Sequence, residues 1–194
     1  MIAVENFAET LPTNLQTVAE FEAWQRQHPH EGSYEFVRGQ IIPKESMKQN
    51  EQRLIRFLSR LFIQTTAFGA GDELFQEMDS YVDGVRKRVP DLAYFTNEQI
   101  GKSGKGTRSS TVFAIEILSD SESYEDVDDK IAERGPQDYF DAGAALVWYI
   151  APKRQRIYVY TAPGESKPYK GTDVISAGPL LPDFSFVVAD LFAA

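Results

Sequence analysis

The chain has 194 residues, 29 acidic against 20 basic side chains, a net charge of −9 and no cysteine. Its length predicts a single domain over 1–194 with a lead-in segment over 1–14. The composition excludes disulfides, thiolate catalysis and zinc–thiolate sites, and the acidity speaks against a broad, sequence-independent grip on DNA. The start has no signal peptide and no apolar stretch approaches the roughly 20 residues of a membrane span, so we expect a cytoplasmic protein without a membrane partner.

The N-terminal third predicts a short helix, a hairpin and a long helix. A Thr-x-x-Glu capping box begins the first helix at Thr17, and this helix should end near His28. The hairpin is expected from Tyr34–Val37 and Gln40–Ile42, which flank an Arg-Gly turn. Apolar residues at helical spacing then predict the strongest helix of the chain, over 49–67.

Two basic segments could face phosphates. Arg53, Arg56 and Arg60 line one side of the long helix, either as a solvated face or as a shallow phosphate-facing stripe. The segment Gly101–Thr107 is similar to a phosphate loop, but that motif needs a glycine five places before the Gly-Lys pair, where Thr96 stands. We therefore expect an ordinary loop there, although its lysines could touch a nucleic-acid backbone.

The rest of the chain predicts strands with a helix between them. The helix should lie within 120–141 and be interrupted or restarted near Gly135, because Pro136 cannot sit cheaply in a helix interior. A short strand and a helical turn should close the chain within 180–192, with Pro182-Asp183 in a turn. The other expected strands are 74–76, 80–82, 88–95, 111–118, 145–150 and 156–160.

Two carboxylates stand out as candidates for chemistry. Glu116 lies within an apolar strand, where burying an unpaired charge is expensive, and Asp91 follows Pro90 at a loop-to-strand junction. On neighbouring strands they would form an oxygen site for Mg²⁺, which could orient a water and neutralise charge on a phosphodiester. Lys130 could then assist the water or the phosphate. From the residues alone, a strand-edge aspartate and a salt-bridged glutamate remain the alternative.

Five short motifs point to a family by their order, and they are YEFVRG at 34–39, PDLAY at 90–94, IEILS at 115–119, DK at 129–130 and LVW at 146–148. In this order they resemble the bacterial family of restriction-endonuclease-like proteins with the PD-(D/E)XK nuclease fold, over about 15–192. The resemblance implies an α/β (mixed α+β) fold with an αβββαβ core, in which a mixed β-sheet is flanked by helices.

The resemblance also implies site residues. Asp91 and Glu116 match the two acidic metal ligands, and the carbonyl of Ile117 often completes their shell. Glu35 matches an upstream acid, an additional metal or water contact. Lys130 matches a lysine displaced onto the helix after the Glu116 strand.

The sequence departs from the family pattern twice. Leu118 stands where the strand motif carries its lysine, and Ala132–Pro136 is inserted before Asp138-Tyr139. Both departures concern the lysine, so the orientation of Lys130 and the activity are less firmly implied than the fold.

The function implied is an endonuclease that hydrolyses DNA with Mg²⁺ or Mn²⁺ as cofactor. About half of the acidic excess lies in 101–150, so binding to DNA should be weak, local and metal-dependent. The alternative is a catalytically weak or inactive nuclease-fold module for interactions, and a homodimer is expected. A third reading, an unrelated small α/β binding protein, requires the order of motifs to be chance.

Overall fold

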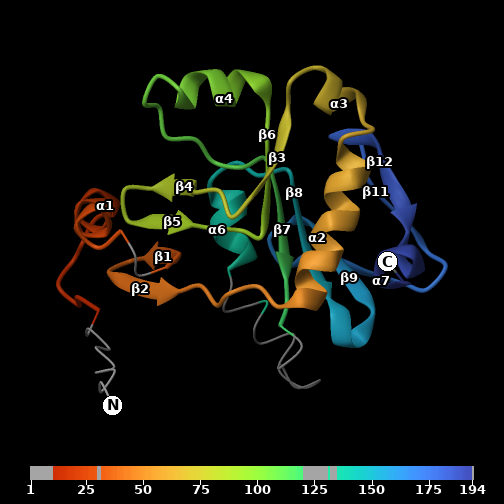
Figure 1. The fold of residues 1–194 in the computed structure, drawn as a ribbon, viewed down its shortest axis with the longest axis horizontal. Helices are drawn as coiled ribbons and strands as arrows, with labels where there is room; N and C mark the ends of the chain where they lie inside the picture. Colours follow the sequence, from red (N-terminus) through yellow and green to blue (C-terminus); the bar gives the residue numbers. More distant parts are fainter. Residues whose placement is uncertain (1–10, 30–31, 120–130, 132–134, 194) are drawn as a thin grey trace, which may run out of the picture.

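A six-stranded mixed sheet forms the centre of the molecule (Figure 1). The computed structural model describes residues 11–29, 32–119, 131 and 135–193. The strand order is β10-β9-β8-β7-β6-β3, and β7 and β8 form the parallel pair while the other neighbours are antiparallel. The strands are β3 (Glu73–Gln76), β6 (Leu92–Phe95), β7 (Phe113–Ile117), β8 (Leu146–Ala151), β9 (Arg156–Ala162) and β10 (Glu165–Lys170).

One face of this sheet packs against α2 (Gln49–Phe62) and the C-terminal segment. That segment comprises β11 (Val174–Ala177), β12 (Leu181–Val187) and α7 (Val188–Ala193), with β11 and β12 paired as a two-stranded sheet. The rings of Trp148 and Phe184 stack at 5.8 Å between centroids. Since β7 and β8 are buried along their whole length, their near-continuous apolar sequence is explained by cover on both faces.

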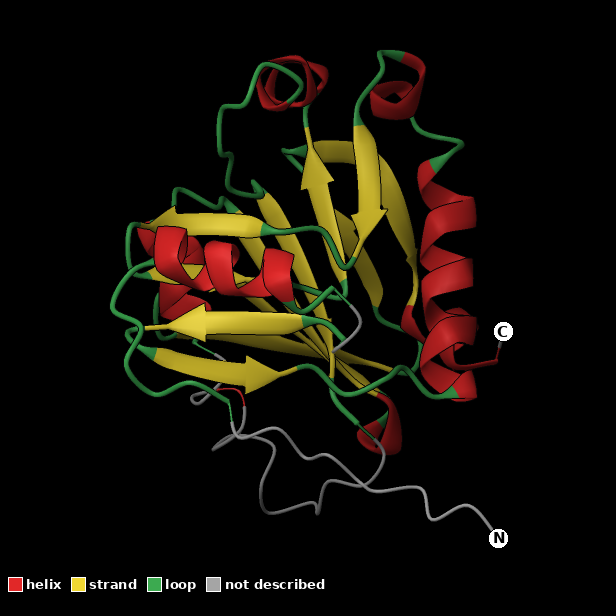
Figure 2. Ribbon diagram, turned by 60° about the vertical axis from the view of Figure 1, so that its left-hand side comes forward, coloured by secondary structure: helices red, strands yellow, loops and turns green. Residues whose placement is uncertain are grey.

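The opposite face is covered by α6 (Pro136–Asp141), whose Tyr139 is fully buried against β7 and β8. Beside it lies a four-stranded sheet of order β2-β1-β5-β4, with α1 (Val18–Gln27) across it (Figure 2). Phe21 of α1 stacks on Phe36 at 5.2 Å between centroids. The four strands are β1 (Tyr34–Val37), β2 (Gln40–Pro43), β4 (Ser80–Asp83) and β5 (Arg86–Arg88).

The mixed α/β fold is confirmed, and three local predictions need correction. The stretch expected as one strand, Arg88–Phe95, is divided between two sheets, because Pro90 has no N–H for a ladder. The long helix ends at Phe62 and a short helix, α3 (Thr66–Gly69), follows. Pro182-Asp183 lies within β12 and not in a turn, and Asp183 accepts a hydrogen bond from the Thr66 N–H at 2.7 Å.

A loop prediction was also wrong. The first half of Gly101–Thr107 belongs to α4 (Asn97–Ser103), which begins with a capping box between Thr96 and Gln99. The capping box stabilises the start of the helix, and the helix therefore continues through Gly101 even though glycine disfavours helices. The strands β10 and β11 were not predicted. The sequence of β10 is largely exposed and polar, and β11 has only four residues, of which two are buried. Of the helices within the described ranges, none is long and apolar enough to cross a bilayer.

Candidate metal and nucleic-acid site

The two predicted carboxylates are cross-strand neighbours. Leu92 of β6 pairs with Ile115 of β7, and Asp91 and Glu116 are the next residues beyond that pair on their two segments. Both are buried, at 6% and 3% exposure. Like charges directly opposite each other destabilise a sheet, so this pair requires a cation.

That cation is the ammonium of Lys44, which sequence reasoning missed. Lys44 Nζ lies 2.9 Å from Asp91 Oδ1 and 3.8 Å from Glu116 Oε2. These two carboxylate oxygens therefore lie no more than about 6.7 Å apart. Two oxygens that bind one cation lie at most about 5.2 Å apart, so a small shift of either side chain is enough for a shared metal. Burial lowers the pKa of Lys44, but the charges of Glu116 and Asp91 outweigh it and the pKa is raised, so the side chain is cationic.

Lys44 directly follows β2 of the first hairpin, and this hairpin places its side chain at the two acids. The Lys44 N–H donates to the Ser33 carbonyl at 2.9 Å, which continues the β1–β2 pairing beyond Pro43. Glu35 pairs with Ile42, and strand side chains alternate, so Lys44 points to the same face as Ile42 and Glu35. This alternation was the signal available in the sequence, but it required knowing that the hairpin lies beside the PD element.

The remaining carboxylate oxygens are also held. Asp91 Oδ2 accepts from the Ile117 N–H at 2.5 Å, and Glu116 Oε1 accepts from the Tyr139 hydroxyl at 2.5 Å. Burial and the charge of Glu116 raise the pKa of Tyr139 well above its usual value, so its hydroxyl stays a donor. Each carboxylate thus has one oxygen fixed by a neutral donor and one directed at the Lys44 ammonium.

Ile117 reaches the same site through its backbone. The β6–β7 pairing ends at Leu92–Ile115, and Pro90 lies two residues before Leu92. Proline has no N–H, so it cannot donate to the Ile117 carbonyl as a ladder partner would. The proline of the PD element thus ends the β6–β7 ladder where Asp91 takes the Ile117 N–H.

Glu35 contacts the two residues Arg88 and Val89, which lie just before Pro90 and Asp91 in the chain. Its Oε1 accepts from the Val89 N–H and its Oε2 from Arg88, both at 2.9 Å. The Arg88 guanidinium also donates to Asp138 of α6 at 2.6 Å. Burial lowers the pKa of Arg88, but Glu35 and Asp138 outweigh it and the net pKa is raised. Glu35 therefore braces the segment before Asp91 through Val89.

The lysine matched by the motif order, Lys130, lies outside the described residues, as do Ala132–Arg134 of the inserted stretch. Gly135 and Pro136 begin α6, so the expected restart of a helix at this point is confirmed. Leu118 is buried in the core against α6 and supplies no polar atom. Of the two histidines, His28 stacks on Trp24 at 4.8 Å between ring centroids, and His30 is not described.

The donor set fits a hard divalent cation that keeps waters. Within the described ranges no group of three or more acidic or histidine side chains is arranged to hold a metal ion. The described side chains bring together two carboxylates, which are oxygen donors, and the family resemblance adds the Ile117 carbonyl. Mg²⁺ is usually bound through one or two carboxylates, with waters and substrate phosphate completing its octahedron. This set of donors therefore fits the usual coordination of Mg²⁺.

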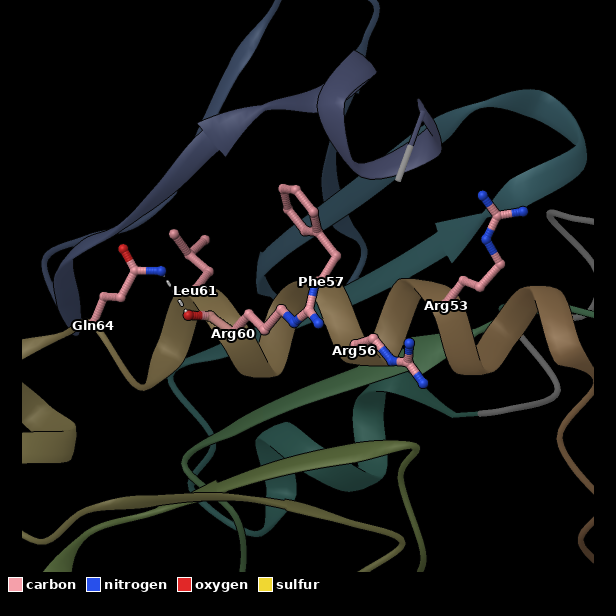
Figure 3. A pocket seen from close by; sticks show the side chains of 6 residues that line it. All are labelled: Arg53, Arg56, Phe57, Arg60, Leu61 and Gln64. Atoms are coloured by element: carbon pink, nitrogen blue, oxygen red, sulfur yellow. Dashed lines mark hydrogen bonds between the residues drawn. The ribbon is translucent and has the colours of Figure 1, made fainter.

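The arginine face of α2 borders a cavity of about 420 Å³ (Figure 3). Arg53, Arg56 and Arg60 are exposed, and Phe57 packs edge-on against Phe186 beneath them. In the described part of the chain, neither Arg56 nor Arg60 has a carboxylate within ion-pair distance. The further lining residues are Leu61 and Gln64.

The start of α2 lies beside the carboxylate site. Lys48, the N-cap of α2, donates through its ammonium to Ser119 Oγ at 2.7 Å. Ser119 follows β7 two residues after Ile117, so the arginine face begins next to the end of β7 that carries Glu116 (Figure 1).

Comparison with solved structures supports the fold. The crystal structure of "a putative nuclease belonging to DUF820" from Anabaena variabilis matches with a TM-score of 0.67 and 20% sequence identity. The match covers 84% of this chain and 91% of that chain. A search of curated proteins finds no match.

A family model agrees with the motif order. The model of the Uma2 family, "Putative restriction endonuclease", matches residues 18–189. This range contains the hairpin that carries Glu35 and Lys44, the PD element and the Glu116 strand. The chain belongs to the Uma2 family of restriction-endonuclease-like proteins.

Proposed function

We propose that the protein is an endonuclease that hydrolyses phosphodiester bonds in DNA with Mg²⁺ or Mn²⁺. The observation that carries the proposal is the convergence of the Asp91 and Glu116 carboxylates on one cationic centre, in a chain of this family. A merely structural pair of acids at this depth would gain stability from apolar replacement, whereas a cation site needs both charges.

In this proposal Asp91, Glu116 and the Ile117 carbonyl hold the metal. The metal would supply activation of the attacking water and neutralisation of charge on the phosphate. The chain's own residues set the geometry, because the Ile117 N–H fixes Asp91 and the Tyr139 hydroxyl fixes Glu116. One lysine assists the water or the phosphate, and the family motif offers Lys130 for that role.

The arginine face of α2 is proposed as the grip on the DNA backbone. Arg53 to Arg60 spans about 10 Å of helix, at 1.5 Å per residue, starting beside the carboxylate site. The net charge of −9 opposes a general affinity for DNA. The guanidinium groups of Arg56 and Arg60, without described carboxylate partners, give the local contact that such an acidic protein needs.

The test is cleavage of supercoiled plasmid DNA with Mg²⁺ or Mn²⁺ against EDTA. Wild type should nick or linearise the plasmid, and Glu116→Gln and Asp91→Asn should not. Glu165→Gln on the exposed strand β10 is the matched control and should cleave like wild type. Equal cleavage by wild type and Glu116→Gln would identify a contaminating nuclease.

The rival function is a catalytically inactive interaction module that dimerises through the nuclease fold. It predicts no cleavage by the wild type under any metal condition, together with a stable homodimer in sedimentation equilibrium. Binding of Mn²⁺, followed by electron paramagnetic resonance, separates an inactive protein that keeps its metal site from one without such a site.

A further inference from the structure

Resting on the proposed function, we propose that Lys44 is the catalytic lysine of this site and that its ammonium contacts the scissile phosphate. In the family motif a lysine follows the strand glutamate by two positions, and here the buried Leu118 stands at that position. A catalytic lysine must therefore come from elsewhere in the fold. Among the described residues, the hairpin supplies it, because the Lys44 ammonium lies within ion-pair distance of both acids.

Lys44 has a donor to spare in the site. An ammonium has three N–H groups. One donates to the Val89 carbonyl at 2.6 Å and a second faces Asp91 Oδ1 at 2.9 Å. Glu116 Oε2, at 3.8 Å, is within ion-pair range but beyond hydrogen-bond distance. Among the described residues, the third N–H is therefore available to an incoming oxygen.

The Val89 contact holds Lys44 independently of the acids. Val89 is itself fixed, because its N–H donates to Glu35 Oε1 at 2.9 Å. When a divalent cation binds the oxygens of Asp91 and Glu116, Lys44 can give up its contacts with these oxygens and keep its hydrogen bond to the Val89 carbonyl. Glu35 is then a positioning residue that acts on Lys44 through Val89.

The charge balance of the site also requires this lysine. Asp91 and Glu116 carry two negative charges, which a divalent cation alone only neutralises. Adding Lys44 to these two acids and the cation gives this set of described groups one positive charge, which is the sign that attracts a phosphodiester and stabilises charge developing on it.

A different role for Lys44 is that of a counter-ion that only stabilises the metal-free protein. The two roles differ in what its removal does. A counter-ion competes with the metal and contributes nothing to cleavage, so its removal would tighten metal binding and leave cleavage equal or faster. A catalytic lysine, when removed, leaves metal binding equal or tighter but abolishes cleavage.

The experiment compares Lys44→Met with Lys130→Met in the full chain. Mn²⁺ affinity is measured by electron paramagnetic resonance, and cleavage is measured under saturating Mn²⁺. For Lys44→Met we expect Mn²⁺ affinity equal to or tighter than that of wild type and a cleavage rate reduced about 100-fold or more. Lys130→Met tests the competing assignment. Removing the assisting lysine costs about 100-fold or more, so a Lys130→Met rate within about tenfold of wild type supports Lys44 as that lysine.

Lys44→Gln is a second variant that controls for a folding defect, because it keeps a polar N–H donor on the side chain without the positive charge. It should melt closer to wild type than Lys44→Met and show the same split between metal binding and cleavage. Cleavage at the wild-type rate by either folded Lys44 variant would overturn the assignment, as would loss of cleavage in Lys130→Met alone. A wild type that binds Mn²⁺ but cleaves no nucleic acid would overturn the proposed function itself, and the Lys44 role with it.

Discussion

Tyr139 of α6 donates its hydroxyl hydrogen to Glu116 Oε1 of β7 at 2.5 Å, in the fully buried layer between that helix and the central sheet. The bond leaves Glu116 Oε2 as the oxygen directed at Lys44. It also joins the region after the inserted stretch to the site. Although Lys130 is not described, α6 thus contributes to the carboxylate pair through Tyr139.

Replacing Tyr139 by phenylalanine should loosen Glu116 and weaken Mn²⁺ binding by about 10-fold, since partners that orient metal ligands contribute about 10–100-fold in affinity. Mn²⁺ titration followed by electron paramagnetic resonance measures the effect. Tyr94→Phe is the matched control, because Tyr94 also donates to a carboxylate, Asp72 at 2.6 Å, away from the site. Equal Mn²⁺ affinity in both variants would show that the Tyr139 bond does not orient Glu116.

Arg88→Met should lower the free energy of unfolding by about 3 kcal/mol, because it removes the described ion-pair partner of the half-buried Glu35 and one of the two described cations of the buried Asp138, which keeps Arg86. Urea denaturation at neutral pH measures the loss. Lys102→Met removes an exposed pair with Glu98 and should cost less than about 1 kcal/mol. A loss in Arg88→Met no larger than in this control would mean that water reaches the Arg88 pair.

The sequence alone was sufficient to identify the two acids as candidates, because each is distinguished by its immediate neighbours in the chain. Pro90 precedes Asp91, and Glu116 interrupts an apolar strand that must be buried on both faces. Their meeting follows from the antiparallel register of β6 and β7, in which Asp91 and Glu116 are the next residues beyond the Leu92–Ile115 pair. Local pattern therefore predicted the fold class and singled out the two acids that the structure brings together.

Lys44 could not be found in this way, because nothing local distinguishes it from neighbouring surface lysines such as Lys48. Its importance arises from contacts with Val89 and Asp91, more than forty positions away along the chain. Likewise, Glu35 was expected near the metal, and its partners Arg88 and Val89 depend on how the two sheets pack. Such long-range contacts are set by tertiary structure.

Acid should destabilise the attachment of α6 to the four-stranded sheet. Arg86 pairs with Asp83 and Asp141, each at 2.7 Å. Burial raises the pKa of Asp83, but Arg86 outweighs it and the net pKa is lowered, and the hydrogen bond from Arg86 lowers the pKa of Asp141. Because both folded-state pKa values lie below the ordinary 3.8, this stability is complete above that pH and is lost as the pH falls below it.

Asp141→Asn should therefore flatten the acid limb of the stability curve. Urea denaturation from pH 7 to pH 3 should show a smaller loss of unfolding free energy below about pH 4 than in wild type. Asp190→Asn, at an exposed position of α7, is the control and should follow the wild-type curve. Parallel curves for wild type and Asp141→Asn would place the acid sensitivity elsewhere.

Removing Arg56 and Arg60 together should reduce the salt dependence of DNA binding. Each ion pair with a phosphate contributes about 0.9 to the slope of log K against log salt concentration, so Arg56→Ala/Arg60→Ala should lower the slope by about 2. Fluorescence anisotropy with labelled duplex DNA, with Ca²⁺ in place of Mg²⁺, measures the slope without cleavage. The same charge is removed in Lys102→Ala/Lys105→Ala, on and just after α4, at the opposite end of β7 from Glu116 (Figure 1).

This control pair should keep the wild-type slope, because its lysines lie away from the carboxylate site and Lys102 already pairs with Glu98. If the α4 pair lowered the slope and the α2 pair did not, DNA would approach from the other end of the sheet. Because Asp91 and Glu116 lie at the end where α2 begins, that result would also separate the DNA-binding face from the proposed metal site. The salt dependence therefore tests whether DNA binding and cleavage use one continuous surface.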